Sequence, residues 1–288
     1  MENGKTELQR ILEMTFDIPF HVESGIANGD PWYKIRPAGY TNELFEIRLS
    51  FLNQLRLNME FLPEAYAASL IKDMSDASAD QRATFLGYAK ILSERRAKIN
   101  FEINNNEASL VNDSDWPQQW KNITLKITKS PIIEEDENFA PEKIIIDWGC
   151  LFSGMVLSLI KVVPVDNPEQ IEGASEGRLH KVITNKYERS AVNRNLCLVV
   201  KGYSCKVCGM DFQSKYGKLG IGYIHVHHII PVSKMGPGYV VDPINDLEPV
   251  CPNCHMMLHK KDPPLEIEEL KKIMTDTNAN NIQNMGYL

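Results

Sequence analysis

Two Cys-x-x-Cys pairs constrain the fold of this sequence more than any other feature. Cys205 and Cys208 form the first pair, and Cys251 and Cys254 form the second after 42 intervening residues. A spacing of two residues lets both sulfurs of a tight turn face the same ion, and four thiolates complete a closed tetrahedral site. We therefore expect a structural Zn²⁺ that replaces part of the core of a small folded unit. The alternative is two unrelated cysteine pairs, one of them redox-active.

The two remaining cysteines, Cys150 and Cys197, lie in apolar surroundings, and we expect them to be inert core thiols. We find no basic start followed by an apolar core at the N-terminus, so the paired cysteines indicate metal rather than disulfides, and we expect a cytoplasmic protein. The most apolar window, residues 144–160, is short for a membrane span and contains Asp147 and two glycines. We expect a buried helix there and no membrane insertion.

Five of the seven histidines lie within a stretch of 35 residues. His227 and His228 are adjacent on a predicted strand, so their side chains point in different directions. His255 and His259 are four residues apart on a predicted helix, so they share one face. One strand histidine and two helix histidines can therefore converge on a cation, which leaves the other strand histidine free to act as a base.

The residues near these four histidines give a less specific signal of function. His225 lies two residues before His227 and can share its face, so we expect either a supporting position in the site or ordinary packing. Tyr216 and Gly217 are expected to shape the preceding loop rather than to take part in chemistry.

Composition divides the chain, because residues 164–177 are rich in proline, glycine and acidic residues and lack periodicity, as is typical of a linker. We predict an α+β protein with four parts: a mixed α/β N-terminal domain at 1–165, a linker at 166–177, a C-terminal domain at 178–265, and a helix and tail at 266–288.

Apolar periodicity predicts the individual elements. Helices are expected at residues 7–16, 63–71, 80–99, 144–160, 179–201 and 252–260. Strands are expected as a pair within residues 44–61, and at 99–103, 120–127 and 221–230.

Charge is distributed unevenly. The whole chain carries −7, but residues 174–262 contain 12 lysines and arginines against 7 acidic residues, which leaves +5 there and −12 elsewhere. Nucleic acid is bound mainly through phosphate neutralisation, so we expect this part to contact DNA unless the imbalance is chance. The predicted phosphate contacts, each of which alone also fits a solvated surface charge, are Arg189, Arg194, Lys215 and Lys218.

Residues 202–260 resemble the HNH endonucleases, which have a ββα-metal (His-Me finger) fold. The form with two Cys-x-x-Cys pairs, found in McrA-like restriction enzymes that cut modified DNA, is the most similar. The His-His-Ile-Ile-Pro segment matches the first strand motif of the family. The resemblance covers about residues 176–262 and implies a general base at His228 and metal ligands at His227, His255 and His259.

The middle residue of the HNH pattern departs from the family. The position nine residues before His255 is Asp246, with Asn245 beside it. In the family this residue braces a loop and orients the base, which a carboxylate can also do. Residues 212–220 and 188–189 also look like the segments that precede the family's catalytic strand.

Phosphodiester hydrolysis needs an activated water and neutralisation of the developing charge. Neutral His228 is suited to take a proton from water at physiological pH. A divalent ion at the other histidines would contact the scissile phosphate and stabilise the leaving oxygen. Three imidazoles are softer ligands than Mg²⁺ prefers, so Mn²⁺, Ni²⁺, Co²⁺ or Zn²⁺ should bind well, while the resemblance also allows Mg²⁺.

We therefore expect a metal-dependent DNA endonuclease of restriction or anti-phage defence, whose N-terminal domain recognises a target or senses a signal by analogy. Two rivals are a non-catalytic zinc module that binds nucleic acid or protein, and a chain whose N-terminal domain carries the main activity. Double-strand cutting with one active site per chain would favour a homodimer. Four aromatic residues could hold an extruded base or could simply pack: Trp32, Tyr33, Trp116 and Trp120.

Overall fold

The computed structural model describes residues 2–38, 44–52, 56–132, 141–160, 190–230, 239–261 and 263–285. The chain divides into two compact units, unit 1 (Met1–Ala191) and unit 2 (Val192–Leu288). The predicted linker at 166–177, both of its boundaries, the 179–189 part of a predicted helix, and Arg189 lie outside the described residues.

Unit 1 is built on a seven-stranded sheet in which every pair of neighbours is antiparallel, in the order β1-β2-β3-β4-β7-β5-β6. The strands are β1 (Phe20–Ala27), β2 (Asp30–Pro37), β3 (Phe45–Leu52), β4 (Arg56–Pro63), β5 (Lys98–Ile103), β6 (Asn106–Glu107) and β7 (Ile123–Lys129). The first four follow one another as a meander, and β7 inserts between β4 and β5.

The sheet has one apolar and one polar face because its side chains alternate. In β3 the buried side chains Ile47, Leu49 and Phe51 lie on one face. On the other face Glu46 is also buried, and its carboxylate accepts from Arg36 at 2.8 Å and from Arg48. A buried carboxylate is tolerated there because it is paired with cations.

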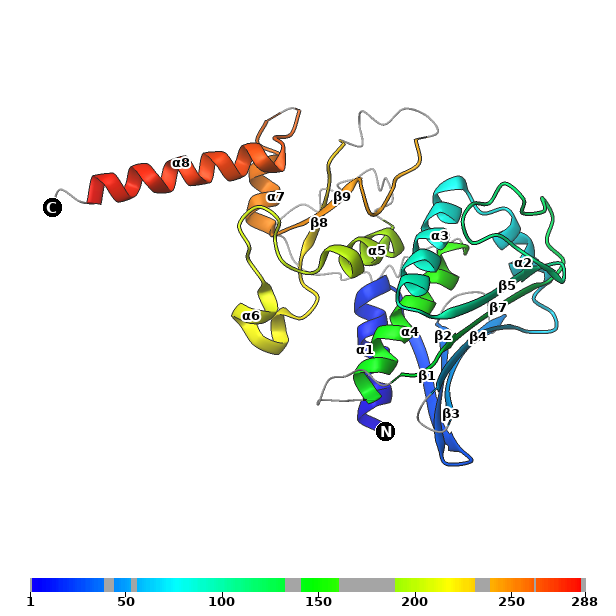
Figure 1. Ribbon diagram of the computed structural model, residues 1–288. Coiled ribbons are helices and arrows are strands. Elements are labelled where there is room, and N and C mark those ends of the chain that lie inside the picture. The colour runs from blue at the N-terminus through cyan, green and yellow to red at the C-terminus, as the bar shows by residue number, and fades with distance from the viewer. Residues whose placement is uncertain are drawn as a thin grey trace, which may run out of the picture. The chain divides into compact units, whose positions relative to one another are not determined.

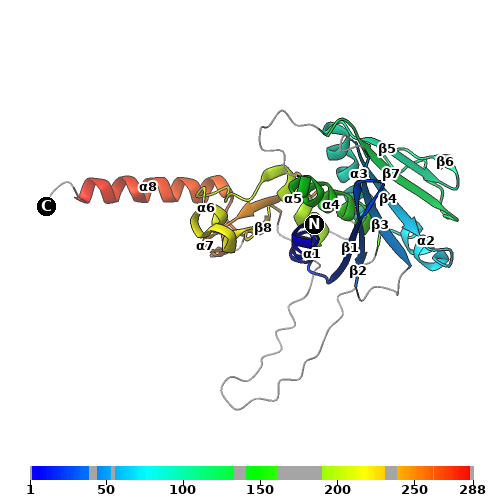
Figure 2. The ribbon, with the colours of Figure 1, turned by 90° about the horizontal axis from the view of Figure 1, so that it is seen from below.

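Helices cover the apolar face, as Figures 1 and 2 show for α1, α3 and α4. The helices of unit 1 are α1 (Glu2–Phe16), α2 (Ala68–Ser75), α3 (Ala79–Glu94) and α4 (Pro141–Ser158). Helix α3 begins with a capping box between Ser78 and Gln81. Helix α4 is apolar almost all round and buried along 148–158, as predicted for this window. Among the described residues no helix has the length and apolar character needed to cross a bilayer.

Three of the four aromatic residues considered for a base pocket are buried within unit 1. Trp116 and Trp120 are each only 6% exposed. The ring of Trp116 lies 5.6 Å from that of Phe85 and 5.3 Å from that of Phe101, and the ring of Trp120 lies 6.3 Å from that of Phe101. Tyr33 is buried in the sheet. These three residues therefore pack in the core of unit 1.

Unit 2 is smaller, and its described residues combine helices with one strand pair. Its elements are α5 (Ala191–Lys201), α6 (Phe212–Tyr216), the 3-10 helix η1 (Gly217–Gly220), β8 (His225–His228), β9 (Leu247–Val250), α7 (Pro252–Leu258) and α8 (Ile267–Met285). Strands β8 and β9 are antiparallel, with His227 opposite Glu248 and His228 opposite Leu247. The two units together confirm the α+β prediction.

Several predicted elements differ in extent. The helix predicted from residue 63 is wrong at its start, because Pro63 ends β4 opposite Phe45 and the helix begins at Ala68. The strand predicted at 221–230 is limited to β8. The hairpin of β1 and β2, and strand β9, were not predicted. The helices α1, α3, α4 and α7 and the strands β3, β4, β5 and β7 overlap the ranges predicted for them, although α1 begins five residues earlier and α3 ends five residues earlier than predicted.

We predict that Gly154→Ala destabilises unit 1, although alanine ordinarily stabilises a helix by about 1 kcal/mol. A Cβ at Gly154 would lie 2.4 Å from the buried ring of Tyr88, so we expect a loss of about 1–3 kcal/mol in the free energy of unfolding. The matched control is Gly149→Ala, whose Cβ would meet Leu8 at 3.2 Å and should cost less. Tryptophan fluorescence during denaturation reports on unit 1, because all four tryptophans lie there. Equal stability of the two variants would contradict this packing.

Candidate metal centres

The first cysteine pair lies on a tight knuckle between α5 and α6. The backbone N–H of Cys205 donates to the carbonyl of Met210 at 2.9 Å, and the N–H of Gly209 donates back to the carbonyl of Cys205 at 2.9 Å. Gly209 has a φ of 73°, a left-handed conformation that glycine adopts without the cost of a Cβ clash. The turn therefore holds the sulfurs of Cys205 and Cys208 on one side.

The second cysteine pair begins helix α7. Cys251 is the N-cap, its sulfur accepts from the backbone N–H of Cys254 at 3.4 Å, and Pro252 occupies the first turn. Proline suits this position because the N–H it lacks would have no intrahelical partner. The same backbone geometry thus starts the helix and aims both sulfurs.

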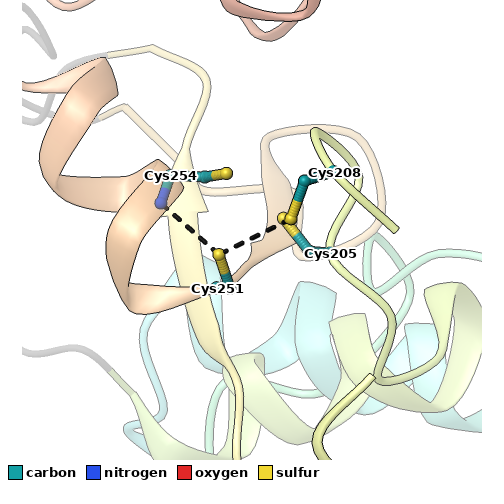
Figure 3. Close-up of side chains that lie close together, drawn as sticks. All are labelled: Cys205, Cys208, Cys251 and Cys254. Carbon is teal, nitrogen blue, oxygen red and sulfur yellow. Dashed lines mark hydrogen bonds between the residues drawn. The ribbon is translucent and has the colours of Figure 1, made fainter. Parts of the chain in front are cut away.

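The four sulfurs of the two pairs form one group. Their Sγ atoms all lie within 4.8 Å of one another, and Figure 3 shows the knuckle and the start of α7 facing each other. The sulfurs of Cys208 and Cys251 are 3.8 Å apart. Tetrahedral Zn²⁺ with Zn–S bonds of about 2.3 Å places its sulfurs roughly 3.8 Å apart, so this distance fits zinc. None of the six cysteines forms a disulfide.

The electrostatics of the group also fit a cation. Burial raises the pKa of the Cys254 thiol, and the neighbouring sulfurs of Cys251, Cys205 and Cys208 raise it further. Burial opposes ionisation of Cys205 too, but backbone hydrogen bonds at Cys208, Cys251 and Val207 hold its pKa below the usual value. Four adjacent sulfurs cannot all ionise alone, whereas a divalent cation stabilises the thiolates.

Three histidines form a second group. The candidate ligand nitrogens of His227, His255 and His259 all lie within 4.8 Å of one another. The three ring centroids are 5.4, 5.0 and 4.9 Å apart pairwise, and each pair of ring planes crosses at 76°. His227 is buried on β8, while His259 is exposed at the C-cap of α7. The group is therefore open on one side, as a catalytic metal site requires.

His228 and His225 flank this group on the strand. His228 follows His227 on β8, so its side chain projects from the opposite face, and it is half-buried. His225 lies on the same face as His227, and its Nδ1 is 3.4 Å from Nδ1 of His255. His225 therefore contacts a candidate metal ligand, a position that suits a residue that orients the ligand.

Asp246 braces the loop that precedes β9. Its carboxylate accepts from the hydroxyl of Tyr239 and from the backbone N–H of Asp242, both at 2.8 Å. Its backbone carbonyl accepts from the N–H of Ile229 at 2.9 Å, directly after His228. Asn245 instead donates to Asp242 at 2.6 Å. Asp246 is thus linked to the histidine strand by its backbone.

A pocket of about 420 Å³ lies beside His227 within unit 2. Glu248, which is opposite His227 in the strand pair, accepts from Nζ of Lys201 at 2.6 Å through Oε1. Its Oε2 is buried without a hydrogen-bond partner among the described residues. Neither Lys201 nor Glu248 was predicted from the sequence, because the position of Glu248 opposite His227 depends on the pairing of β9 with β8.

The four residues predicted to contact phosphate have different surroundings in the structure. Arg189 lies outside the described residues. Arg194 donates through Nη2 to the carbonyls of Gly222 at 3.1 Å and Ile224 at 2.9 Å, and burial lowers its pKa. These bonds give Arg194 a structural role, and its contact with phosphate stays a prediction. Lys215 and Lys218 are exposed on α6 and η1.

Comparison with protein families places this geometry in a class. Residues 205–261 match the family model of the HNH endonuclease. This segment is therefore an HNH endonuclease domain, a class that suggests metal-dependent cleavage of nucleic acid, and it contains both metal groups. Comparison with curated proteins and with solved structures gives no match.

We predict that Cys251→Ser lowers zinc content and destabilises unit 2, because the substitution removes both a ligand and the sulfur that caps α7. Metal analysis of the purified protein and its soluble yield provide the measurement. The matched control is Cys197→Ala, a buried cysteine of the same unit outside the group, which should keep its zinc. A folded Cys251→Ser protein that carries full zinc would contradict the assignment.

Cys150 and Cys197 should be unreactive in the folded protein. Burial raises the pKa of the Cys150 thiol to about 12 and that of Cys197 to about 11, so few molecules carry a thiolate at mildly alkaline pH. Mass spectrometry after iodoacetamide treatment should find both residues unmodified before unfolding and modified after it. Rapid labelling of either residue in the native protein would contradict its burial.

Proposed function

We propose that the chain is a DNA endonuclease whose reaction centre is the histidine group of unit 2. One observation carries the proposal: His227, His255 and His259 cluster, while His228 follows on the same strand and projects from the other face. A purely structural zinc module needs the four cysteines but has no use for this second group. The HNH match of the segment supports nucleic acid as the substrate.

The proposed roles follow from the positions of the rings. His227, His255 and His259 would hold a divalent cation, which supplies charge neutralisation at the scissile phosphate when bound. His228 in its neutral form accepts a proton from the attacking water through a ring nitrogen. Asp246 is a positioning residue, because its backbone carbonyl fixes the strand just after His228 and its carboxylate orders the loop.

The two groups should take different metals. Four thiolates form a closed site that suits Zn²⁺ as a structural ion. Three imidazoles with an open side suit a borderline ion such as Ni²⁺, and they also admit Mn²⁺ or Mg²⁺ where phosphate oxygens complete the coordination. The exposed side of His259 gives a substrate access to such an ion.

Unit 1 would select the target or sense a signal, as part of restriction or anti-phage defence in the cytoplasm. Support for this part is the domain arrangement alone, in which a large separate unit accompanies the HNH segment. A homodimer would supply the second active site for a double-strand cut. Digestion of methylated, hydroxymethylated and unmodified DNA in parallel would identify whether modified bases are the target.

We predict that His228→Ala lowers DNA cleavage by about 10²–10⁴-fold, the usual contribution of a positioned general base. The variant should keep both metals, because His228 belongs to neither group. The measurement combines plasmid digestion with metal analysis and circular dichroism. His21→Ala, which removes an exposed imidazole from unit 1, is the matched control and should cut normally.

His259→Ala provides the complementary variant. It should lose the second metal and the activity while it keeps zinc, because it removes a ligand from the histidine group only. If His228→Ala cuts at the wild-type rate, His228 is not the base. If the wild-type chain cuts no DNA with any divalent ion, the nuclease proposal fails.

A further inference from the structure

An exposed apolar surface on unit 2 has no part in either metal group. It is formed by Tyr216, Leu219 and Tyr223, which are 52%, 88% and 51% exposed. All three belong to the short segment 212–223 that contains α6 and η1. We call this segment the aromatic loop. Leu219 in particular is almost fully exposed, which folding alone does not favour.

The aromatic loop holds its rings in fixed positions. Phe212 stacks on Tyr216 at a centroid distance of 5.8 Å with planes 20° apart, and it meets Tyr223 edge-on at 4.9 Å. Gly220 packs against the backbone of Phe212 so closely that a Cβ would lie 2.0 Å from its carbonyl oxygen. η1 therefore folds back onto α6 and supports the exposed rings from behind.

Ring contacts connect the aromatic loop to the histidine group. Tyr223 meets the ring of His225 at 6.3 Å, and His225 meets the ring of His255 at 5.3 Å. His255 is one of the three candidate metal ligands. The exposed rings and the proposed reaction centre thus belong to one packed row of side chains.

The charged side chains within the aromatic loop are both positive. Lys215 and Lys218 are exposed beside Tyr216 and Leu219, and residues 212–223 contain no acidic residue. The preceding carboxylate, Asp211, accepts from the backbone N–H of Ser214 at 2.6 Å and so serves as a helix cap. Exposed rings with flanking lysines suit a ligand that combines aromatic faces with negative charge.

We propose that the aromatic loop binds unstacked bases of the DNA strand beside the cleaved bond. Tyr216 stacks on a base, Leu219 inserts between neighbouring bases, and Lys215 and Lys218 contact the flanking phosphates. Base stacking on an aromatic ring tolerates any sequence, and apolar wedges unstack base steps. The inference rests on the proposed DNA substrate, and it gives Tyr216 a role in binding beyond the expected one of shaping the loop.

The test measures binding separately from cutting. The full chain carrying His228→Ala, with zinc bound, is titrated against a fluorescent single-stranded oligonucleotide and against its duplex, over a range of salt concentrations. Tyr216→Ala and Leu219→Ala are compared with Tyr216→Phe, which keeps the ring. Ile273→Ala on α8, which removes an apolar side chain that is 46% exposed, is the control for Leu219.

We expect single-stranded affinity to fall on the order of 10-fold in Tyr216→Ala and in Leu219→Ala, with little change in Tyr216→Phe and Ile273→Ala. The salt dependence should stay unchanged in these variants, because stacking releases no counterions. Lys218→Gln should instead reduce the slope of log K against log salt by about 0.7 for a single strand. This contrast separates ring contacts from charge contacts.

Three outcomes overturn the proposal: wild-type affinity in both alanine variants, equal losses in Tyr216→Phe and Tyr216→Ala, or weakened self-association with unchanged DNA binding. The third would make the surface an interface between copies of the chain. Failure of the nuclease proposal can be told apart from failure of this one. If the wild-type chain cuts no DNA but Tyr216→Ala still weakens DNA binding, the nuclease proposal fails and the binding role of the aromatic loop stands.

Discussion

Helix α7 is the constraint on which the geometry of unit 2 depends. Its N-cap, Cys251, and its first-turn residue Cys254 belong to the sulfur group, while His255 and the C-cap His259 belong to the histidine group. Because the helix is only seven residues long, an ion at its start fixes the direction of the rings at its end. A structural metal at the sulfurs would therefore also orient the rings that we propose as ligands of a second metal, and it would stabilise the small core around Leu258 and Val250.

The grouping of these cysteines and histidines could be predicted from the sequence because its constraints are local. Cys-x-x-Cys spacing, the adjacency of His227 and His228, and the four-residue step from His255 to His259 all follow from turn, strand and helix geometry. The partner strand β9 was missed because Pro249 makes a strand assignment unfavourable from sequence alone. Without β9, neither the position of Glu248 nor the backbone bond from Ile229 to Asp246 could be inferred.

The sheet of unit 1 depends on pairings between distant residues, and only part of it was predictable. Strands β3 and β4 alternate clearly, whereas β1 and β2 were missed although Asn28 and Gly29, both at positive φ, form the tight turn between them. An Asn-Gly pair is a strong hairpin signal that the sequence offered. The position of β7 between β4 and β5 has no local signal in the sequence, because it depends on pairing with two strands that come much earlier in the chain.

We propose that α7 joins two separate metal sites of different chemistry. Anomalous X-ray diffraction, recorded at the zinc and nickel absorption edges from crystals of the protein loaded with both metals, tests it most directly. The account predicts zinc among the sulfurs of Cys205, Cys208, Cys251 and Cys254, and a nickel peak among the rings of His227, His255 and His259. A single ion shared by cysteines and histidines, or an absence of any ion at the three rings, would contradict it.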